Sequence, residues 1–321
     1  MEPLSFKNVS ALVIGDVMLD VFLYGKSHRL SPEAPVPVVA LDHDSKVLGG
    51  AGNVASNLKS LGIHVDICGF VGEDINDIRD LLGVADISAG NLILCKGMHT
   101  ITKTRVVSNG QHLVRFDKEV QFNNPESVVE LEKRIRQISE RVYDFIIISD
   151  YNKGVISKQI MDIVKDSFRS VPIFIDPRPK NVNLYKDVFC MTPNLSEAQA
   201  ILNTDSNDAE NLARKIKDML NLKCVVITLS EKGLLLLDDK NSPHYVNAYQ
   251  IQTEQERLHR MDVSGAGDTL IGTFAACLSS GHDLLKSAFI GNVAAAIVVN
   301  KLGTAICSIE ELNRELQHLK D

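Results

Sequence analysis

Short apolar runs of strand length alternate with amphipathic helical patterns through most of the 321-residue chain. Each run is apolar at consecutive positions rather than at every second one, as expected of strands buried on both faces. The alternation predicts an α/β fold, a three-layer αβα sandwich in which a mostly parallel sheet lies between helices. The predicted strands are residues 11–14, 65–71, 145–149, 172–176, 188–192 and 224–229.

Two segments interrupt this alternation. Residues 17–46 are polar and contain three prolines, and in residues 97–117 two β-rich runs flank Ser108-Asn109-Gly110. An Asn-Gly pair between such runs is a strong hairpin signal. Both segments therefore predict β insertions that form a small lid over a pocket at the strand ends. Because no linker, repeat or low-complexity stretch divides the chain, we expect residues 1–321 to form a single domain.

Composition, charge and the N-terminal sequence argue against several classes of protein. Thirty-four Lys and Arg against 41 Asp and Glu give a net charge of −7, which argues against general nucleic-acid binding. The N-terminus lacks an export signal, and no apolar run approaches the roughly 20 residues of a membrane span. The six cysteines are far apart and form no C-x-x-C pair, which is typical of reduced core residues. We therefore expect a cytoplasmic protein with no nucleic-acid or membrane partner.

The stretch 261–269 precedes an apolar helical run at 270–278 and contains Gly265-Ala266-Gly267-Asp268. Small residues there let backbone N–H groups at a helix N-terminus approach an anion, which the helix dipole also favours. Asp268, in the first turn, could accept a proton from an attacking hydroxyl, a contribution of typically ~10²–10⁴-fold. The isolated motif fits equally well a tight turn followed by an aspartate that caps the helix.

A second glycine-rich stretch, Gly49-Gly50-Ala51-Gly52-Asn53, precedes a helix predicted at 53–61. A dinucleotide-dependent dehydrogenase would carry its glycine fingerprint directly after the first strand, but Gly15-Asp16-Val17-Met18 does not supply that fingerprint.

These motifs resemble the signatures of the PfkB, or ribokinase-like, family of carbohydrate kinases. Residues 262–268 match its D-x-x-G-A-G-D signature, and residues 49–53 resemble its N-terminal glycine-rich signature, which ends in asparagine. The resemblance implies a ribokinase-like fold and ATP-dependent phosphorylation of a sugar. Within the family, the likeness is closest to kinases that phosphorylate the anomeric hydroxyl of D-glycero-β-D-manno-heptose 7-phosphate, which gives the 1,7-bisphosphate for ADP-heptose and lipopolysaccharide core synthesis. The stretches that carry it are 15–20, 29–38, 100–105, 149–154, 192–197 and 301–304.

By this resemblance, Asp268 is the catalytic base, and the backbone amides of Gly265, Ala266 and Gly267 stabilise the transferring phosphoryl group. Asn194 and Glu197 match an N-x-x-E element that acts near Mg²⁺ and the ATP phosphates, with the metal held through water. The local pattern alone favours a different explanation, in which Asn194 is a helix N-cap and Glu197 completes a capping box. Thr228 and Gly233 correspond to the ATP-binding side of the family.

The resemblance also assigns an acceptor side. Asp16 and Asp20 follow the first predicted strand, where carboxylates can accept hydrogen bonds from sugar hydroxyls. As isolated acids they would be solvent-facing turn residues. Asp150 and Lys153 follow another strand and are expected to complete the acceptor pocket.

Gly49, Gly50 and Asn53 resemble the family's sugar contacts, although the glycines could simply form a turn that leads into a helix. Lys103 and Arg105 alternate along one face of a predicted lid strand and could bind a phosphate already present on the acceptor. They favour a sugar phosphate over a neutral sugar. The alternative is a charged edge strand that discourages aggregation.

Further expectations rest on the family. We expect a homodimer through the lid, a K⁺ site near Asp262 and Gly303, and a separate nucleotidyltransferase, because the chain ends soon after a helix at 309–319. Gly52 and Arg178-Pro179-Lys180 depart from the heptose-kinase pattern, which leaves another PfkB-type acceptor open: a hexose phosphate, a pentose or a nucleoside. A catalytically silent sugar-phosphate sensor is a further alternative, but it would be expected to lose Asp268 or Glu197.

Overall fold

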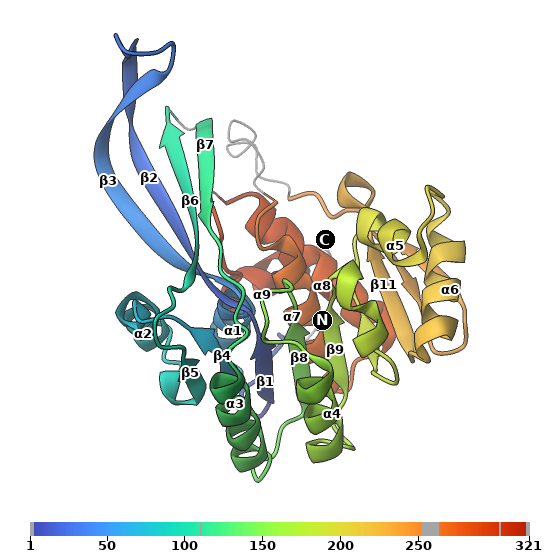
Figure 1. The fold of residues 1–321 in the computed structure, drawn as a ribbon. Coiled ribbons are helices and arrows are strands. Elements are labelled where there is room, and N and C mark those ends of the chain that lie inside the picture. Colours follow the sequence, from blue (N-terminus) through green and yellow to red (C-terminus); the bar gives the residue numbers. More distant parts are fainter. Residues whose placement is uncertain (1–2, 110, 252–262, 302, 319–321) are drawn as a thin grey trace.

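The computed structural model describes residues 3–109, 111–251, 263–301 and 303–318, and a central sheet lies between two helical layers (Figure 1). The spatial strand order is β13-β12-β11-β10-β9-β8-β1-β4-β5, and neighbouring strands from β11 to β5 are parallel. The mostly parallel sheet predicted from the sequence is therefore confirmed. Its strands are β1 (Ser10–Gly15), β4 (His64–Val71), β5 (Leu92–Leu94), β8 (Phe145–Ser149), β9 (Ile173–Asp176), β10 (Cys190–Met191), β11 (Cys224–Thr228), β12 (Leu234–Leu237) and β13 (Pro243–Val246).

The helices divide between the two faces of this sheet. In β1, Ala11 and Val13 pack into one hydrophobic cluster and Leu12 and Ile14 into the other, because successive side chains in a strand point to opposite faces. Apolar side chains of five helices pack into the first cluster: α1 (Ala51–Ser60), α2 (Ile75–Val84), α7 (Ala266–Ser279), α8 (Leu284–Val299) and α9 (Ile309–His318). The second includes α3 (Pro125–Ile138), α4 (Lys158–Ser167), α5 (Leu195–Leu202) and α6 (Ala209–Leu220).

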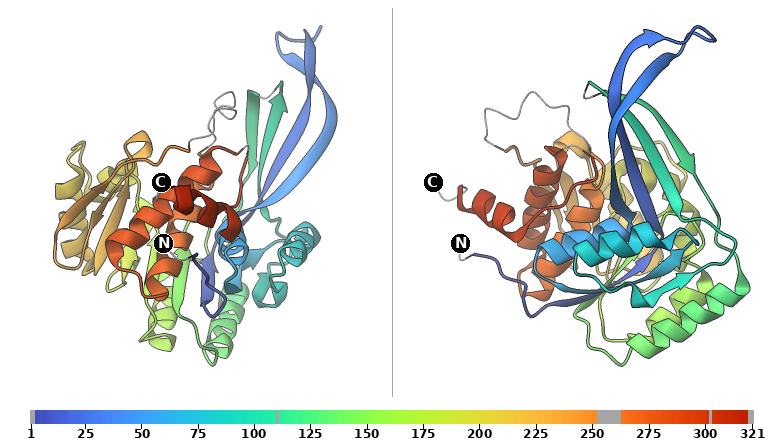
Figure 2. Two further views of the ribbon diagram at one scale, coloured as in Figure 1. Left: turned by 180° about the vertical axis from the view of Figure 1, so that it is seen from behind. Right: turned by 90° about the vertical axis from the view of Figure 1, so that its left-hand side faces the viewer.

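The two predicted β insertions form one four-stranded sheet in the order β3-β2-β6-β7. It projects from one edge of the core, and its long β2–β3 hairpin reaches furthest outward (Figures 1 and 2). Ser108 pairs with Gln111, so a two-residue connection joins β6 to β7 as the Asn-Gly signal predicts, although Gly110 lies outside the described residues. The strands are β2 (Val17–Leu30), β3 (Pro37–Gly50), β6 (Ile101–Ser108) and β7 (Gln111–Lys118).

The strand order reverses at β1. From β1 the sheet continues through β4 to β5 on one side and through β8 to β11 on the other. In open α/β sheets, ligands bind outside the carboxyl ends of the strands at this kind of reversal. Residues that directly follow β1 and β8, including Asp16 and Asp150, therefore lie where a ligand crevice is expected.

Some elements differ from the sequence predictions. The strand predicted at 188–192 contains only Cys190–Met191, and the antiparallel strands β12 and β13 were not predicted. A short apolar run such as Leu234–Leu237 does not reveal its direction in a sheet, since that depends on which neighbour it pairs with. All six cysteines are free and buried, as predicted. Among the described helices, none has both the length and the apolarity needed to cross a membrane.

Candidate active site

Helix α7 begins beside α1 at a glycine that no larger residue could replace without strain. Gly265 has a φ of 81°, and a Cβ atom there would lie 2.7 Å from Asn53 Nδ2. At Gly267, by contrast, a Cβ atom would meet nothing within 4 Å among the described residues. The first turn of α7 therefore presents backbone N–H groups beside open space, as an anion-binding helix N-terminus requires.

Asp268 lies in this first turn and is only 5% exposed. Its Oδ2 accepts a 2.7 Å hydrogen bond from Asn53 Nδ2, and the Tyr151 hydroxyl donates to its Oδ1 at 3.4 Å. Burial raises the pKa of Asp268 to about 6, aided by the charge of Asp20 and opposed by the Asn53 bond. A carboxylate with this pKa is ionised near neutral pH and can still accept a proton. Gly265 is the N-cap of α7, and among the described residues no side chain forms a capping hydrogen bond there, so the alternative in which Asp268 caps the helix is wrong.

Buried polar contacts hold Asn53 against α7. Asn57 Nδ2 donates to Asn53 Oδ1 at 3.2 Å, and Asn57 Oδ1 accepts from the Thr269 hydroxyl at 2.9 Å. The Asn53 amide oxygen is thereby engaged, so its NH₂ group points at Asp268. This network explains how a residue of α1 orients a carboxylate of α7.

Asp16 organises the loop that follows β8. It is 1% exposed, and it accepts backbone N–H groups from Tyr151 at 2.8 Å, Lys153 at 3.0 Å and Val155 at 3.3 Å. Burial, followed by the charge of Asp150, raises the pKa of Asp16 to about 6. Asp16 is therefore not a solvent-facing turn residue, and a sugar hydroxyl would have to share a carboxylate that already has three donors.

Asp150 and Lys153 are also engaged by protein groups. Asp150 Oδ2 accepts from the Tyr185 hydroxyl at 2.6 Å and from Asn181 Nδ2 at 2.8 Å. The Lys153 ammonium forms a 2.8 Å ion pair with Glu119. Both residues stabilise the loop beside the proposed acceptor pocket.

Asp20 forms a buried ion pair with Arg105. Arg105 Nη1 lies 2.6 Å from Asp20 Oδ1, and its guanidinium stacks 5.2 Å from the Phe22 ring centre. The Thr304 hydroxyl donates to Asp20 Oδ2 at 3.1 Å. A buried guanidinium requires such a partner, so Arg105 is not free to bind a phosphate in this arrangement. This differs from the expectation that both Lys103 and Arg105 could bind a phosphate on the acceptor.

Gly49 and Gly50 let the end of β3 approach β1 and β2. A Cβ atom at Gly49 would lie 2.6 Å from Asp20 Oδ2. Gly50 has a φ of 56°, and a Cβ atom there would lie 2.4 Å from the Asp16 carbonyl oxygen. Backbone conformation and packing thus require glycine at Gly50, whereas a side chain at Gly49 would displace the Asp20 carboxylate. Both observations support the turn explanation given above.

Lys103 has different surroundings from Arg105, although the β2–β6 register places both side chains on one face of the lid sheet. Its ammonium lies 5.1 Å from the Tyr151 ring centre and has no ion-pair partner within the described chain. Burial lowers its pKa. Strand β6 lies between β2 and β7, so the edge-strand explanation is wrong.

The predicted nucleotide side lies at the ends of β10 and β11. Asn194 Oδ1 accepts from Glu197 N, and Glu197 Oε2 accepts from Asn194 N, both at 2.9 Å, so the capping box predicted from the local pattern is present. Thr228 forms an isolated β-bridge with Asn194, and Gly233 occupies the turn that leads into β12. The second Glu197 oxygen lies 3.6 Å from Arg178.

The acids between these two sides repel one another. Burial raises the pKa of Asp176, at the end of β9, well above its usual value, and the charges of Asp268 and Glu197 raise it further. Burial also raises the pKa of Glu197. Within the described residues, no three His, Cys, Asp or Glu side chains converge to hold an ion directly. Asn194 and Glu197 carry an amide and a carboxylate oxygen, ligand types that suit Mg²⁺, and because these oxygens also accept from the capping box they would hold an ion that arrives with a nucleotide through water.

The geometry can be compared with known proteins. The family model described as pfkB family carbohydrate kinase matches residues 9–312. The chain belongs to this family. Its ribokinase-like fold also aligns with phosphofructokinase-2 from Escherichia coli in complex with substrates and products, with a TM-score of 0.78 at 17% identity over 98% of this chain and 100% of the other. Ribokinase from Arabidopsis thaliana, complexed with ribose and ATP, aligns with a TM-score of 0.72 at 16% identity over 99% of both chains.

Curated relatives are more similar in sequence. Bifunctional protein HldE from Sulfurimonas denitrificans is 36% identical over 310 residues, which covers 94% of this chain and 63% of the relative. Bifunctional protein HldE from Aliarcobacter butzleri is 37% identical over 318 residues, which covers 95% of this chain and 64% of the relative. This pfkB family chain thus spans slightly less than two thirds of the length of these relatives.

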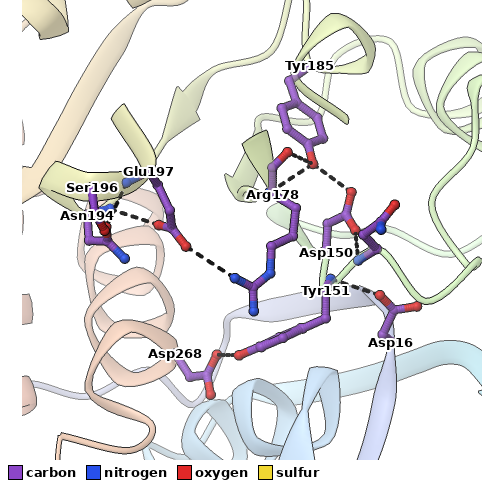
Figure 3. A network of polar contacts seen from close by, with 10 residues as sticks. Asp16, Asp150, Tyr151, Arg178, Tyr185, Asn194, Ser196, Glu197 and Asp268 are labelled. Atoms are coloured by element: carbon purple, nitrogen blue, oxygen red, sulfur yellow. Dashed lines mark hydrogen bonds and ion pairs between the residues drawn. The ribbon is translucent and has the colours of Figure 1, made fainter. Parts of the chain in front are cut away.

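The structure also adds residues that the sequence interpretation of this pfkB family chain missed. Tyr151 contacts Asp268, and Arg178 contacts Glu197 (Figure 3). The charges of Asp268 and Glu197 raise the pKa of the buried Asp176. The Thr304 hydroxyl donates to Asp20. Tyr151 and Asp176 occupy strand ends, which is a signal that could have identified them. Nothing in the sequence shows which neighbour each side chain contacts.

Proposed function

We propose that this protein uses ATP to phosphorylate the anomeric hydroxyl of D-glycero-β-D-manno-heptose 7-phosphate, which yields the 1,7-bisphosphate for ADP-heptose and lipopolysaccharide core synthesis. The carbohydrate kinase activity follows from the family, and the heptose acceptor is inferred from the sequence resemblance and from the HldE relatives. Both pathway and acceptor are proposals for this chain.

The observation that carries the proposal is the position of Lys103. Its partly buried ammonium lies over the Tyr151 ring and has no ion-pair partner in the described part of the chain. The hydroxyl of the same tyrosine donates a hydrogen bond to Asp268. A cation without a partner near the proposed base favours an acceptor that already carries a phosphate. A neutral pentose or nucleoside would offer this ammonium no anionic group to bind directly.

The chain supplies the following steps. Asp268 accepts the proton of the acceptor hydroxyl, whose oxygen attacks the γ-phosphorus of ATP as the bond to the β-phosphate oxygen breaks and ADP leaves. The amides of Gly265, Ala266 and Gly267 stabilise charge on the transferring group. Bound Mg²⁺ neutralises charge on the ATP phosphates, while Asn194, Glu197, Thr228 and Gly233 form the nucleotide side. Asp16, Asp20, Gly49, Gly50, Asn53, Lys103, Arg105, Asp150 and Lys153 form or support the acceptor side.

A monovalent cation such as K⁺ is a further part of the proposal. One solved relative of this fold is phosphofructokinase-2 from Escherichia coli in complex with potassium. In this chain Asp262 lies outside the described residues, so the suggested K⁺ site near Asp262 and Gly303 stays a prediction. Measuring turnover with K⁺ replaced by a bulky organic cation would test it.

The decisive assay measures ADP release from ATP and Mg²⁺ with heptose 7-phosphate, fructose 6-phosphate, ribose and a nucleoside as acceptors. Turnover confined to the heptose phosphate would support the proposal, whereas preferred turnover of another acceptor would contradict the heptose assignment. Ligand binding without turnover on any acceptor would favour the silent sensor.

Lys103→Met sharpens this assay. Loss of a charge-assisted contact should raise the KM for a phosphorylated acceptor about 10- to 100-fold. Lys118→Met, which removes an exposed lysine from β7, is the matched control. An unchanged KM in Lys103→Met would remove the main support for a phosphorylated acceptor.

We also propose that the lid forms a homodimer interface. Exposed apolar side chains occupy its outer strands, including Leu41 at 57% exposure and Phe116 at 54%, and every residue of β7 is exposed. A second copy could cover this surface and the unpaired edges of the sheet. Light scattering during size-exclusion chromatography should show a dimer that Phe116→Asp dissociates.

The separate nucleotidyltransferase stays a prediction about the pathway. It would be contradicted if the purified chain alone formed ADP-heptose from ATP and heptose 1-phosphate.

A further inference from the structure

Tyr151 lies at the centre of the polar network that joins the two sides of the site (Figure 3). Its ring is flanked by two cations, with Arg178 Cζ 4.9 Å and Lys103 Nζ 5.1 Å from the ring centre. Its hydroxyl donates to Asp268 at 3.4 Å. One side chain thus contacts the proposed base, the proposed acceptor-phosphate ligand and an arginine with no assigned role.

Arg178 extends from this ring toward the nucleotide side. Its Nη1 lies 3.6 Å from Glu197 Oε1, and its side chain is still 41% exposed. Its backbone is fixed, because Arg178 N donates to the buried Tyr185 hydroxyl at 3.1 Å and that hydroxyl donates to Asp150. The ion pair and ring contact occupy only part of a guanidinium that has five N–H donors, so further donors remain for an anion.

We propose that Arg178 contacts the transferring phosphoryl group, and that Tyr151 is a positioning residue that holds both the Arg178 guanidinium and the Asp268 carboxylate. This inference rests on the proposed function. Phosphoryl transfer from ATP to the acceptor must cross between Glu197 and Asp268, and Figure 3 shows the Arg178 guanidinium between Glu197 and the Tyr151 ring. A planar guanidinium suits both tasks, since it stacks on an aromatic face and binds phosphate oxygens in pairs.

The chemistry of Tyr151 supports the positioning role. Burial and the nearby charges of Asp268 and Asp176 raise its pKa well above the usual value, so its hydroxyl stays protonated and donates to the ionised carboxylate. A hydrogen bond to the charged form lowers the pKa of Asp268. Other charged groups that act on or near Asp268 in the described part of the chain include Asp20 of β2, Lys103 of β6 and Asp176 of β9. Tyr151→Phe leaves all three in place.

The experiment measures kcat, both KM values and the pH dependence of kcat/KM for wild type, Arg178→Met, Arg178→Lys and Tyr151→Phe. Arg178→Met should lower kcat about 10²- to 10³-fold, as loss of one transition-state donor does, with each KM within about threefold of wild type. Arg178→Lys should recover part of kcat because it retains the charge. Tyr151→Phe should lower kcat about tenfold and shift the acid limb of kcat/KM to higher pH.

Two matched substitutions control for general effects. Arg169→Met removes an arginine that is 80% exposed just beyond α4, and Tyr245→Phe removes the hydroxyl of an exposed tyrosine in β13. Both should retain wild-type kinetics. Thermal unfolding of every variant checks the fold, and Arg178→Lys keeps the test informative if Arg178→Met unfolds.

The outcomes separate this inference from the proposed function. Wild-type turnover with Arg178→Met and Tyr151→Phe both within about threefold of wild type would overturn the inference alone. A change confined to the KM for ATP would also overturn it, because Arg178 would then contact the bound nucleotide equally before and during transfer. If wild type prefers another acceptor, the variants are compared with that acceptor, and only the heptose assignment fails. Absence of turnover on every acceptor would overturn both.

Discussion

Asp16 and Asp268 are both buried aspartates whose pKa is raised to about 6, yet their surroundings differ. Asp16 accepts three backbone N–H groups from one loop. Asp268, within the described residues, accepts one short bond from Asn53 and one long bond from Tyr151, and it lies in the first turn of a helix beside open space at Gly267. A raised pKa therefore does not by itself distinguish a base from a structural acid. The number and type of donors that already occupy the carboxylate make that distinction.

The largest expected effect is on Asp268. Asp268→Asn retains an oxygen but cannot accept the proton of the acceptor hydroxyl, so kcat should fall by about 10²- to 10⁴-fold while the protein stays folded. ADP release and circular dichroism would measure this. A variant with nearly full activity would show that Asp268 is as structural as Asp16.

Substitution of Asp16 should lower the stability of the protein, whereas substitution of Asp268 should lower its turnover. Asp16→Ala leaves three N–H donors, one buried and two partly buried, without their acceptor, and we expect the free energy of unfolding to fall by about 3 kcal/mol. Urea denaturation would measure the loss, with the exposed Asp205→Ala as control. If Asp16→Ala kept its stability but lost turnover, the comparison would be reversed.

The pH dependence of stability tests whether Asp268 is ionised at a cost to folding. Its pKa is about 6 in the folded state and near 3.8 in an exposed aspartate, so the folded protein binds the proton more tightly. The Asp268 carboxyl therefore contributes most to the free energy of unfolding at low pH, and this contribution decreases as pH rises from about 4 through 6. The neutral amide of Asp268→Asn carries no such penalty. The stability of this variant relative to wild type should thus increase between pH 4 and 7, by on the order of 2 kcal/mol.

A pH-independent stability difference in urea titrations at pH 4, 5, 6 and 7 would contradict the raised pKa of Asp268. It would also weaken the comparison, because Asp268 would then lack the property that it shares with Asp16.

The smallest effect is expected at Asn194, where a structural role and a proposed ligand role coincide. Asn194→Ala removes half of the capping box and should destabilise the protein by about 1 kcal/mol. Asn194→Ser should restore the cap without restoring the amide. If the KM for MgATP rises in both variants while stability recovers only in Asn194→Ser, the two roles are separable. An unchanged KM in both would leave Asn194 with the cap alone.

Several site features were predictable because they depend on local sequence. Gly265 to Asp268 open a helix, Asn194 and Glu197 form a capping box, and the Asn-Gly pair joins two strands. Each involves residues a few positions apart, where backbone geometry alone decides the outcome. The different partners of Lys103 and Arg105 were not predictable, since they depend on Asp20 and Tyr151, which are distant in sequence.

The amino-acid sequence alone specifies the α/β class, the β insertions, the glycine-opened helix with its aspartate, and the family. These follow from the periodicity of apolar residues and from motifs that specify backbone conformation. The folded structure was needed to show which carboxylates already have hydrogen-bond donors and which lysine lacks an ion pair in the described chain. It was also needed to show that Tyr151 and Arg178 connect the proposed base to the nucleotide side. Those properties depend on how strand ends from distant segments meet, because hydrogen bonds and ion pairs form only between atoms a few ångströms apart.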